Sequence, residues 1–399
     1  MKVLLVHNHY GSAAPSGENR VFELERDLLN RAGYVVETFE RHSDALRSQG
    51  KLGMFRGALM TPWNPAISRE MREVVKRFKP DVVHAHNTFP MISPSVFSAA
   101  EGCARVLTLH NYRLACPAAI PMREGLICTD CIDRKSVMPA LWHGCYRSSR
   151  LATLPLATNV ALHRWLGTWR SEVEAFISLT NFQKELMAGA GIPAERIHVK
   201  PNFYPGTPAR IAFDNRPSQV VFAGRLGAEK GIEDLVEAWL DWGHDAPELR
   251  IVGDGELRRS LESRSAAAQN ITFLGQVASR TAEMEIANAK LLVLPSRWFE
   301  GFPMVLREAF ALGTPVAVSD QGPLPGIASL ADGIVFSVND PKDLLQKVRS
   351  RWNDEERLSS MALASERAYR EHYSEKKNLE ALSNIYERAI EVCRKSARL

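Results

Sequence analysis

The stretch Val220-Val-Phe-Ala-Gly224-Arg225-Leu226, followed within a few residues by Lys230-Gly231, gives the clearest indication of the fold. A β-branched and aromatic run that ends in glycine is typical of a buried strand leading into a tight turn. The apolar residues of 235–239 then recur at helical spacing. Open α/β sheets are built in this way, and they bind ligands at the carboxyl ends of their strands. The stretch therefore predicts an α/β domain with Arg225 and Lys230 at a binding edge.

Two further segments repeat the pattern of a strand that ends in glycine. They are Leu249-Arg-Ile-Val-Gly253-Asp-Gly255 and Ile271-Thr-Phe-Leu-Gly275-Gln276-Val277. Helical and strand patterns alternate from about residue 205 to 372, which indicates a parallel sheet.

Two cations follow the strand that ends at Gly224. The guanidinium of Arg225 is a planar fork and the ammonium of Lys230 is a mobile point charge, and together they suit a diphosphate. Two surface cations on an ordinary turn would give the same pattern. The choice between these interpretations depends on the acidic residues downstream.

The segment Glu300-Gly-Phe302-Pro-Met304-Val305-Leu-Arg-Glu308 predicts the start of a helix. Pro303 suits the first turn, and apolar residues recur at helical spacing from Phe302 onward. Backbone N–H groups at such a helix start, those of Met304 and Val305, bind phosphate well. Glu300 and Glu308 would then bind sugar hydroxyls. Taken alone, the pair is also compatible with no binding role, in which Glu300 is a loop charge and Glu308 is a solvated helix position.

The first half of the chain predicts a second domain of the same kind. Length and composition fit two such domains, because 399 residues with 45% hydrophobic and 24% charged residues are enough for two cores. We expect domains at 1–204 and 205–372, separated by a proline-containing linker, and a final helix over 373–399. Within the first domain we expect a loop from Gly11 to Gly17, a helix over 18–32, and strands at Lys2–His7, Tyr34–Phe39, Asp81–His86, Arg105–His110 and Ala175–Thr180.

A dinucleotide-binding dehydrogenase is the main alternative for such an architecture. It requires Gly-x-Gly-x-x-Gly directly after the first strand and an acidic residue about twenty positions later. The loop here reads His7-Asn-His-Tyr-Gly11-Ser-Ala-Ala-Pro-Ser-Gly17, so this fingerprint is absent.

Taken together, the motifs resemble those of the family 4 glycosyltransferases of the GT-B fold. The resemblance covers nearly the whole chain, and its specificity lies in the order and separation of the motifs. Those that carry it are Gly224-Arg225-Leu226, Lys230-Gly231, Gly253-Asp254-Gly255, Gly275, the Glu300 to Glu308 pair, His84-Ala-His86-Asn87, Thr108-Leu-His110-Asn111, Ser178-Leu-Thr-Asn and Val199-Lys-Pro201-Asn202.

The resemblance implies two Rossmann-like domains whose parallel sheets face each other across a cleft, with the last helix crossing back to the first domain. It implies retaining, metal-independent front-face transfer of a hexose from a nucleotide diphosphate sugar to a hydroxyl of a glycan or lipid-linked acceptor. No cofactor is implied for catalysis. The departing diphosphate would be stabilised electrostatically.

The resemblance also assigns roles to particular residues. His110 would lie near the transferred sugar, where it donates a hydrogen bond or polarises the reacting centre. Arg225 and Lys230 would stabilise the diphosphate, Glu300 would orient the donor sugar and Glu308 would bind ribose. The other residues expected at the donor are Gly17, Gly224, Gly253, Gln276, Val277, Phe302, Met304 and Val305. Many relatives have glycine where this chain has Pro303. Proline has no backbone N–H, so one hydrogen-bond donor to the phosphate is lost.

Two other functions stay open at this point. A sugar-nucleotide epimerase with the same architecture would need an acid/base pair acting on the sugar ring, and none is recognisable. A non-catalytic protein that binds nucleotide sugars would be expected to have a damaged phosphate site, whereas the four charged residues are present. The sequence does not identify the base, the donor sugar, the acceptor, the linkage or the oligomeric state.

Four of the six cysteines form a separate pattern in an insertion over about 113–150. Cys116, Cys128, Cys131 and Cys145 are compatible with a structural zinc site of four thiolates. Free or redox-variable thiols and an iron–sulfur cluster are the alternatives. Disulfides are disfavoured because the chain shows no secretory segment after Met1-Lys2.

The net charge of +4 is distributed unevenly, since residues 1–200 carry 25 basic and 18 acidic residues. No acidic residue occurs from Arg134 to Ser171, a stretch that contains six basic residues, three tryptophans and a tyrosine. Such a surface suits an anionic membrane or a lipid diphosphate acceptor, although it is also compatible with a solvated basic face. We expect a cytoplasmic protein, peripheral at the inner face of the membrane, with no spanning helix. Nucleic acid binding is disfavoured because no known module is visible.

Overall fold

The computed structural model describes residues 1–11 and 16–396, and the chain divides into two compact units. The first unit comprises Met1–Pro121, Cys128–Pro201 and the residues from Asn378 onward. The second comprises Met122–Ile127 and Asn202–Lys377. Each unit is built around its own parallel sheet.

The first sheet has the strand order β2-β1-β3-β4-β7-β8, and every neighbouring pair is parallel. The five strands predicted for this domain are confirmed, with ends that differ by up to three residues. The short β8 was not predicted. The bounds are β1 (Lys2–His9), β2 (Val35–His42), β3 (Val82–Asn87), β4 (Ala104–Leu109), β7 (Ala175–Ser178) and β8 (Ile197–Val199).

The helices of the first unit include the predicted helix after the first strand and most of the predicted final helix. The other helices had not been predicted. The bounds are α1 (Gly17–Arg31), α2 (Asp44–Arg47), α3 (Gly50–Met60), α4 (Pro65–Phe78), α5 (Ser95–Ala99), α6 (Asp130–Asp133), α7 (Met138–His143), α8 (Arg150–Trp165), α9 (Thr168–Ser171), α10 (Asn181–Gly189) and α18 (Glu375–Ser396).

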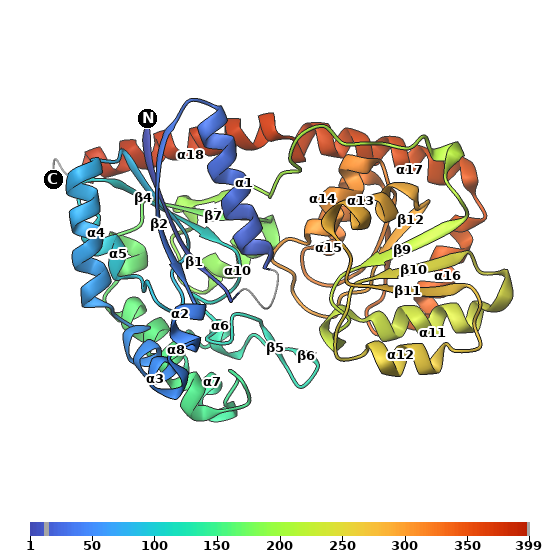
Figure 1. Cartoon of the computed structure of the whole chain (residues 1–399), viewed down its shortest axis with the longest axis horizontal. Coiled ribbons are helices and arrows are strands. Elements are labelled where there is room, and N and C mark those ends of the chain that lie inside the picture. Colours follow the sequence, from blue (N-terminus) through green and yellow to red (C-terminus); the bar gives the residue numbers. More distant parts are fainter. Residues whose placement is uncertain (12–15, 397–399) are drawn as a thin grey trace. The chain divides into compact units, whose positions relative to one another are not determined.

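Helices α1 and α18 cover one face of the first sheet (Figure 1). Alternate residues of β1, β3, β4 and β7 point to this face, as the two-residue period of a strand requires. Phe22 and Leu29 of α1 pack against them together with Leu382, Ile385 and Tyr386 of α18. A segment from the far end of the chain therefore completes the core of the first unit.

The second sheet has the strand order β11-β10-β9-β12-β13-β14, again with parallel neighbours. The three glycine-ended strands predicted from the sequence are β9, β10 and β11. The bounds are β9 (Gln219–Ala223), β10 (Glu248–Val252), β11 (Ile271–Gly275), β12 (Leu291–Leu294), β13 (Val316–Ser319) and β14 (Ile334–Phe336).

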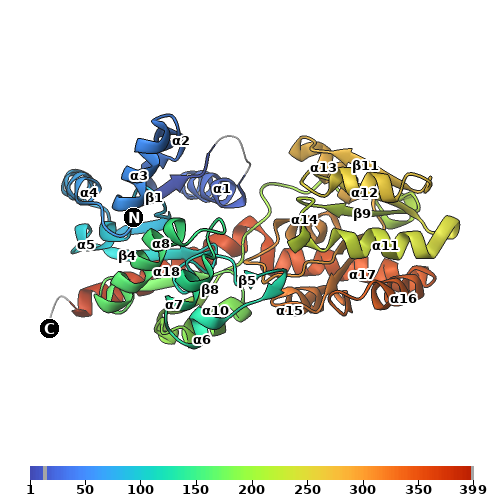
Figure 2. The ribbon, with the colours of Figure 1, turned by 90° about the horizontal axis from the view of Figure 1, so that it is seen from below.

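Helices follow the strands of the second unit in alternation. Two of them, α11 and α16, pack against each other (Figure 2). The bounds are α11 (Ile232–Trp242), α12 (Arg258–Arg264), α13 (Ser279–Asn288), α14 (Met304–Leu312), α15 (Leu324–Ala328), α16 (Pro341–Trp352) and α17 (Glu355–Ala368). A two-stranded hairpin, β5 (Met122–Arg123) and β6 (Leu126–Ile127), interrupts the cysteine-containing insertion.

The order of the second sheet fixes where a ligand would bind. Strands β9, β10 and β11 succeed one another to one side, and β12, β13 and β14 to the other. The order therefore reverses between β9 and β12. In open α/β sheets the crevice beyond the carboxyl ends of such a strand pair is the usual binding site.

Candidate active site

The segments that follow β9 and β12 touch each other at this reversal point. Gly231 has a φ of +65°, and a Cβ atom on it would lie 2.0 Å from the carbonyl oxygen of Pro295. A larger residue would separate the segments, so the close approach requires glycine. The N–H of Arg297 donates to the carbonyl of Glu229 at 2.9 Å. These contacts place Lys230 beside the segment that contains Glu300.

Lys230 and Glu300 form an ion pair across this junction. The Nζ atom of Lys230 lies 2.7 Å from Oε1 of Glu300, which is only 5% exposed. Ser296 donates a hydrogen bond to the same oxygen at 2.7 Å. The ammonium also lies 5.1 Å from the ring centroid of Trp298, within the range of a cation–π contact. The lysine cation is therefore fixed at the carboxyl edge of the sheet.

Arg225 makes a different contact from the one that the sequence suggested. Its Nη2 and Nε atoms donate to Oε1 of Glu229 at 2.6 and 3.0 Å, and its side chain is 62% exposed. The hydrogen bond to Glu229 raises the pKa of the guanidinium, which stays charged. The structure thus pairs Arg225 with Glu229 and Lys230 with Glu300.

Gly224, Gly253 and Gly275 lie together at the ends of β9, β10 and β11. The N–H of Gly253 donates to the carbonyl of Gly275 at 2.8 Å, and that of Gly224 donates to Val252 at 2.9 Å. A Cβ atom on Gly253, whose φ is +132°, would lie 1.9 Å from the carbonyl oxygen of Gly224. Gln276, which is exposed, and Val277 follow directly after β11. Packing of the backbone thus accounts for glycine at 253.

A helix, α14, occurs in the predicted segment but begins at Met304, so Pro303, which we expected in the first turn, is its N-cap. The N-cap residue has extended backbone angles, and Pro303 adopts a ψ of 113°. The N–H groups of Met304 and Val305 belong to the first turn, where intrahelical acceptors are lacking. Phe302 is buried, with its ring centroid 5.6 Å from that of Tyr373, so packing accounts for this residue.

Glu308 lies inside α14, as predicted, in an environment that disfavours its charge. Burial, opposed by Arg307 and assisted by the neighbouring carboxylate of Glu283, raises the pKa of its carboxyl to about 7. Glu283 in turn accepts a hydrogen bond from the hydroxyl of Tyr204 at 2.9 Å. A ligand hydroxyl that donates to Glu308 would favour the ionised form.

His110 lies in the first unit, directly after β4. It shares a hydrogen bond of 3.0 Å with His86 on β3, between Nε2 of His110 and Nδ1 of His86. Burial, assisted by the nearby His7 and Lys200, lowers the pKa of His110 to about 3. The ring is therefore neutral near pH 7 and can donate or accept a hydrogen bond.

A buried ion pair lies behind His86. The Nζ atom of Lys200 is 3.3 Å from Glu25 Oε1, and Nε2 of His86 is 4.0 Å from Glu25 Oε2. The sequence motifs include His86 and Lys200 but indicate no role for either of them, and they do not include Glu25. The available signal was the charge of Glu25 on the apolar face of the helix predicted over 18–32.

Gly17 is the first residue of α1, and its neighbour Glu18 accepts a hydrogen bond from Asn111 at 2.8 Å. Residues 12–15 of the predicted loop from Gly11 to Gly17 lie outside the described residues. The predicted role of Gly17 at the donor therefore stays a prediction.

The four clustered cysteines are free thiols in the first unit. Burial raises the pKa of Cys116 to about 12 and that of Cys131 to about 11, and the neighbouring Cys145 thiol raises both. Cys128 has the same effect on Cys131. The thiols therefore share one region. Among the described residues, however, the groups of three whose ligand atoms lie within 4.8 Å of one another are formed by other side chains.

Comparison with known families gives a match to each half of the chain. The profile described as Glycosyltransferase Family 4 matches residues 17–205, and the one described as Glycosyl transferases group 1 matches residues 207–368. The two matches together cover most of the chain, which therefore belongs to the family 4, or group 1, glycosyltransferases.

Named relatives match this chain over different fractions of its length. The exopolysaccharide phosphotransferase SCO2592 of Streptomyces coelicolor is 32% identical over 197 residues, which are 47% of this chain and 20% of that protein. The sulfoquinovosyl transferase SQD2 of Arabidopsis thaliana is 24% identical over 74% of this chain and 54% of its own length. The phosphatidyl-myo-inositol mannosyltransferase of Mycolicibacterium smegmatis is 24% identical over 92% and 89%. The chain thus spans between a fifth and about half of the first two relatives.

Solved structures confirm the GT-B fold. Sucrose-phosphate synthase from Thermosynechococcus elongatus matches with a TM-score of 0.68 and 15% identity over 97% of this chain and 98% of that one. Alr3699/HepE from Anabaena, solved in complex with UDP, matches with a TM-score of 0.63 and 14% identity over 97% and 100%.

Proposed function

We propose that this chain transfers a hexose from a nucleotide diphosphate sugar to a hydroxyl of a glycan or a lipid-linked acceptor. The observation that carries the proposal is the pair of Lys230 and Glu300 at the reversal point of the second sheet. A cation fixed at that edge stabilises the negative charge that develops on a departing diphosphate. Glu300 then exchanges part of its contact with Lys230 for a hydroxyl of the donor sugar.

The other residues of the second unit fit the same donor. The first-turn N–H groups of Met304 and Val305 offer donors to phosphate oxygens at the positive end of the α14 dipole. Ionised Glu308 accepts hydrogen bonds from ribose hydroxyls, and the segment of Gln276 and Val277 contacts the base. Arg225 reaches the diphosphate by leaving Glu229, which its exposed position allows.

We further propose that transfer proceeds with retention at the anomeric carbon and needs no metal ion. Lys230 and Arg225 supply the positive charge that a metal supplies in other phosphate sites. A leaving phosphate oxygen takes the proton of the acceptor hydroxyl, while neutral His110 donates a hydrogen bond to the sugar. The names of the relatives support sugar transfer, since they include sulfoquinovosyl, kanosaminyl and mannosyl transferases. HepE has also been solved with UDP-glucose.

Replacing Lys230 by alanine tests the proposal. We expect Lys230→Ala to lower the rate of donor hydrolysis or transfer at least 100-fold, because the diphosphate loses its main charge partner. The exposed Lys347→Ala, in the same unit, should keep full activity. Nucleotide release from a panel of uridine, guanosine and adenosine diphosphate sugars measures both variants, and circular dichroism confirms that they are folded.

The same assay separates the alternative functions. Conversion of the donor to an isomeric nucleotide sugar would indicate an epimerase, and binding without turnover would indicate a non-catalytic protein. A folded Lys230→Ala variant with wild-type activity would contradict the assigned site.

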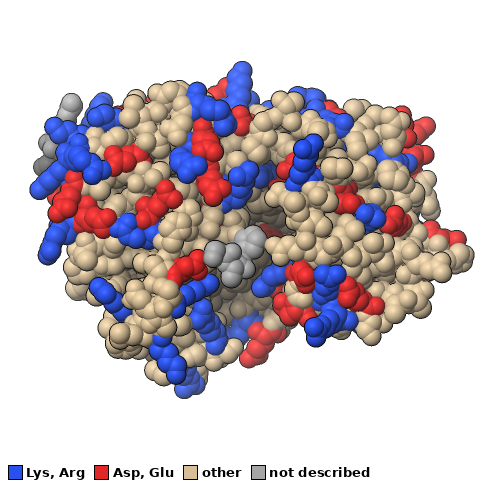
Figure 3. Space-filling view, viewed as in Figure 1, with Lys and Arg blue, Asp and Glu red and all other residues tan. Residues whose placement is uncertain are grey.

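We also propose that the first unit docks on the anionic inner face of the cell membrane. Helices α3 and α7 both contact α8, and residues 45–69 and 134–171, which contain all three, have no acidic residue. Figure 3 shows basic side chains at the lower left of the first unit, where Figure 1 draws α3 and α7. Among the described residues, every helix is too short or too polar to cross a bilayer. The exposed apolar side chains on this surface include Leu52, Phe55, Leu59, Trp142, Leu151 and Trp165.

Exposed aromatic and aliphatic side chains between basic residues are the composition that inserts into the headgroup region of anionic bilayers. Such docking brings the first unit to lipid-linked acceptors. We name the surface formed by α3, α7 and α8 the basic apolar surface.

The four thiols of the cysteine-containing insertion are proposed to hold a structural zinc ion. Their shared region, and the short hairpin between Cys116 and Cys128, support this assignment. Metal analysis of the purified protein tests it, and less than about half an equivalent of zinc bound through sulfur would contradict it.

A further inference from the structure

Two short motifs on neighbouring strands of the first sheet place four polar side chains on one face. His7 and His9 are separated by one residue on β1, and Glu40 and His42 are separated by one residue on β2. The strands are parallel and in register, with His7 opposite Glu40 and His9 opposite His42. Because side chains alternate between faces with a period of two, all four lie on the same side of the sheet.

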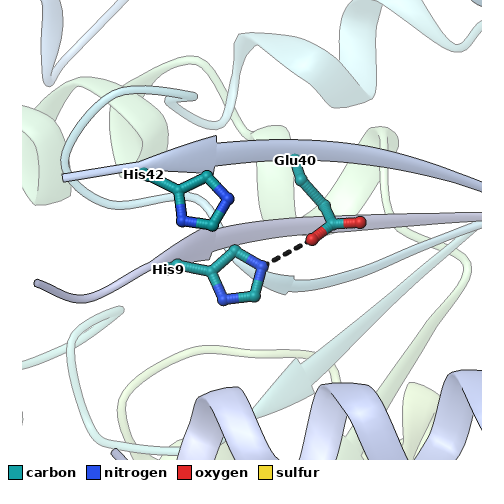
Figure 4. A group of neighbouring side chains, drawn as sticks. All are labelled: His9, Glu40 and His42. Atoms are coloured by element: carbon teal, nitrogen blue, oxygen red, sulfur yellow. Dashed lines mark hydrogen bonds and ion pairs between the residues drawn. The ribbon is translucent and has the colours of Figure 1, made fainter. Parts of the chain in front are cut away.

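Three of these side chains form a compact group at the carboxyl ends of the two strands (Figure 4). Each of His9, Glu40 and His42 offers one ligand atom, and these atoms all lie within 4.8 Å of one another. Nε2 of His9 lies 2.6 Å from Oε2 of Glu40. The two imidazole rings lie parallel, with centroids 4.4 Å apart.

The backbone beneath this group is held firmly. The N–H and the hydroxyl of Ser43 both donate to the carbonyl of His9, at 3.0 and 2.8 Å. Asn8 donates to the same hydroxyl at 2.9 Å. The ends of β1 and β2 are therefore fixed to each other before any ligand arrives, which is the preorganisation that a metal site requires.

A third imidazole, that of His7, lies beside the group. The ring centroid of His7 is 4.6 Å from that of His9, and its Nε2 contacts Asn19 Oδ1 at 2.9 Å. Its Nδ1 atom is buried and has no hydrogen-bond partner within the described part of the chain. One imidazole nitrogen on this face, Nδ1 of His7, is therefore not used by a hydrogen bond to the described residues.

We propose that His9, Glu40 and His42 bind a zinc ion, with water in the remaining position of a tetrahedral site. Two imidazoles and one carboxylate are a ligand set that zinc accepts at about 2.0–2.2 Å, which brings the ligand atoms to about 3.5 Å from one another. The group closes to this size by rotations of Glu40 and His42, since His42 is exposed and the Glu40 side chain is 27% exposed. Coordination through Nε2 of His9 moves its proton to Nδ1 or to solvent.

A second group of three, formed by Glu25, His84 and His86, does not carry the same inference. Lys200 lies 3.3 Å from Glu25 and already supplies the positive charge. Both nitrogens of His84 are hydrogen-bonded, one to Tyr386 and the other to Thr108. A cation there would have to displace a buried ammonium, whereas the arginine whose charge acts on Glu40, Arg26, already forms an ion pair with Asp27.

The test uses the full chain after removal of metals with a chelator. Zn²⁺ is titrated calorimetrically, and Co²⁺ is added separately as a spectroscopic substitute. Cobalt bound by nitrogen and oxygen gives visible ligand-field bands without the intense near-ultraviolet charge-transfer bands of cobalt thiolates. The spectrum therefore separates this site from the cysteines. The variants are His42→Ala and Glu40→Gln, with His244→Ala as a control because that side chain is 96% exposed in the second unit.

We expect His42→Ala and Glu40→Gln each to weaken zinc binding at least tenfold and to abolish the ligand-field bands that lack charge transfer. His244→Ala should bind as the wild type does. Equal binding by wild type and both ligand variants would overturn the proposal, as would a wild-type cobalt spectrum made only of thiolate bands. The readout uses no donor or acceptor, so it is independent of the proposed transferase activity.

Discussion

Glu308 shows how a single partly buried carboxyl couples protonation to stability and to ligand binding. Its pKa of about 7 exceeds the ordinary value of 4.5, so the folded state holds the proton more tightly than the unfolded state does. The free energy of unfolding must then fall as the pH rises from about 4.5 through about 7. The shift corresponds to about 3 kcal/mol when deprotonation is complete.

Glu308→Gln removes this dependence, because the amide does not titrate. We expect the variant to gain up to about 3 kcal/mol relative to the wild type between pH 5 and pH 8. Urea denaturation at the two pH values measures the difference, with exposed Glu237→Gln as the control. Parallel stability curves for wild type and Glu308→Gln would contradict the prediction.

Donor affinity should show the opposite trend, rising above pH 7 in the wild type alone, because ribose hydroxyls donate to the ionised form.

Gly253 shows a backbone requirement at the same scale. An alanine Cβ at this position would lie 1.9 Å from the Gly224 carbonyl and would need an unfavourable φ of +132°. We expect Gly253→Ala to destabilise the second unit by at least about 3 kcal/mol. Gly189→Ala is the matched control, because a Cβ there meets no atom of the described residues within 4 Å. Thermal denaturation followed by circular dichroism compares them, and equal midpoints would be inconsistent with the structure.

Sequence reasoning anticipated some residue contacts and missed others for a definite reason. The glycine after β9 and the helix start at Met304 leave local signals, so Lys230 and Glu300 could be singled out. The bond from Ser296 to Glu300 and the pairing of Arg225 with Glu229 leave none, because serine and glutamate are common in loops. Only the packing of the two segments decides which side chains meet.

Among the elements, α18 contributes more to the first unit than its place in the chain suggests. Leu382 is fully buried in the core beneath β1, β3 and β4. We expect Leu382→Ala to cost about 2–5 kcal/mol, because it leaves a cavity in a packed core. Leu363→Ala on α17, where the side chain is 65% exposed, should change the free energy of unfolding by less than about 0.5 kcal/mol.

Chemical denaturation of the two leucine variants, with probes in each unit, checks this prediction. Destabilisation confined to the second unit would contradict the assignment of α18 to the first core.

Elements differ in how readily the sequence reveals them. Strands β9, β10 and β11 were predicted because continuous apolar runs ending in glycine are typical of buried parallel strands. Helix α3 was missed because Gly50, Gly53 and Gly57 lower its helix propensity. Gly53 and Gly57 allow close packing, since Cβ atoms there would lie 2.3 Å from the Leu46 carbonyl and 2.6 Å from its side chain. Tertiary contacts therefore stabilise a helix that its own residues disfavour.

At the scale of the molecule, the basic apolar surface predicts that the protein binds to vesicles of anionic lipid. We expect flotation with vesicles that contain anionic phospholipid, and weaker flotation in high salt, because screening reduces the attraction of the basic residues. The double variant Trp142→Glu/Trp165→Glu should bind at least fivefold less, since both side chains are exposed on this surface. Met284→Glu, which alters an exposed residue of the second unit, should bind like the wild type.

Binding to anionic vesicles no stronger than to neutral ones would contradict membrane docking. It would leave the assignment of Lys230 and Glu300 unaffected, because these residues lie in the second unit.

The contribution of α18 to the first core has a consequence for biosynthesis. A ribosome adds about 5–20 residues per second, so Asn378 emerges roughly 10–35 s after Pro201. During this interval the nascent first sheet displays an apolar face that awaits its last covering helix. The second unit, in contrast, is synthesised almost without interruption and can fold in the meantime. Protection of the early sheet by a chaperone therefore matters most in this interval, and faster elongation between residues 202 and 378 should raise the yield of native protein.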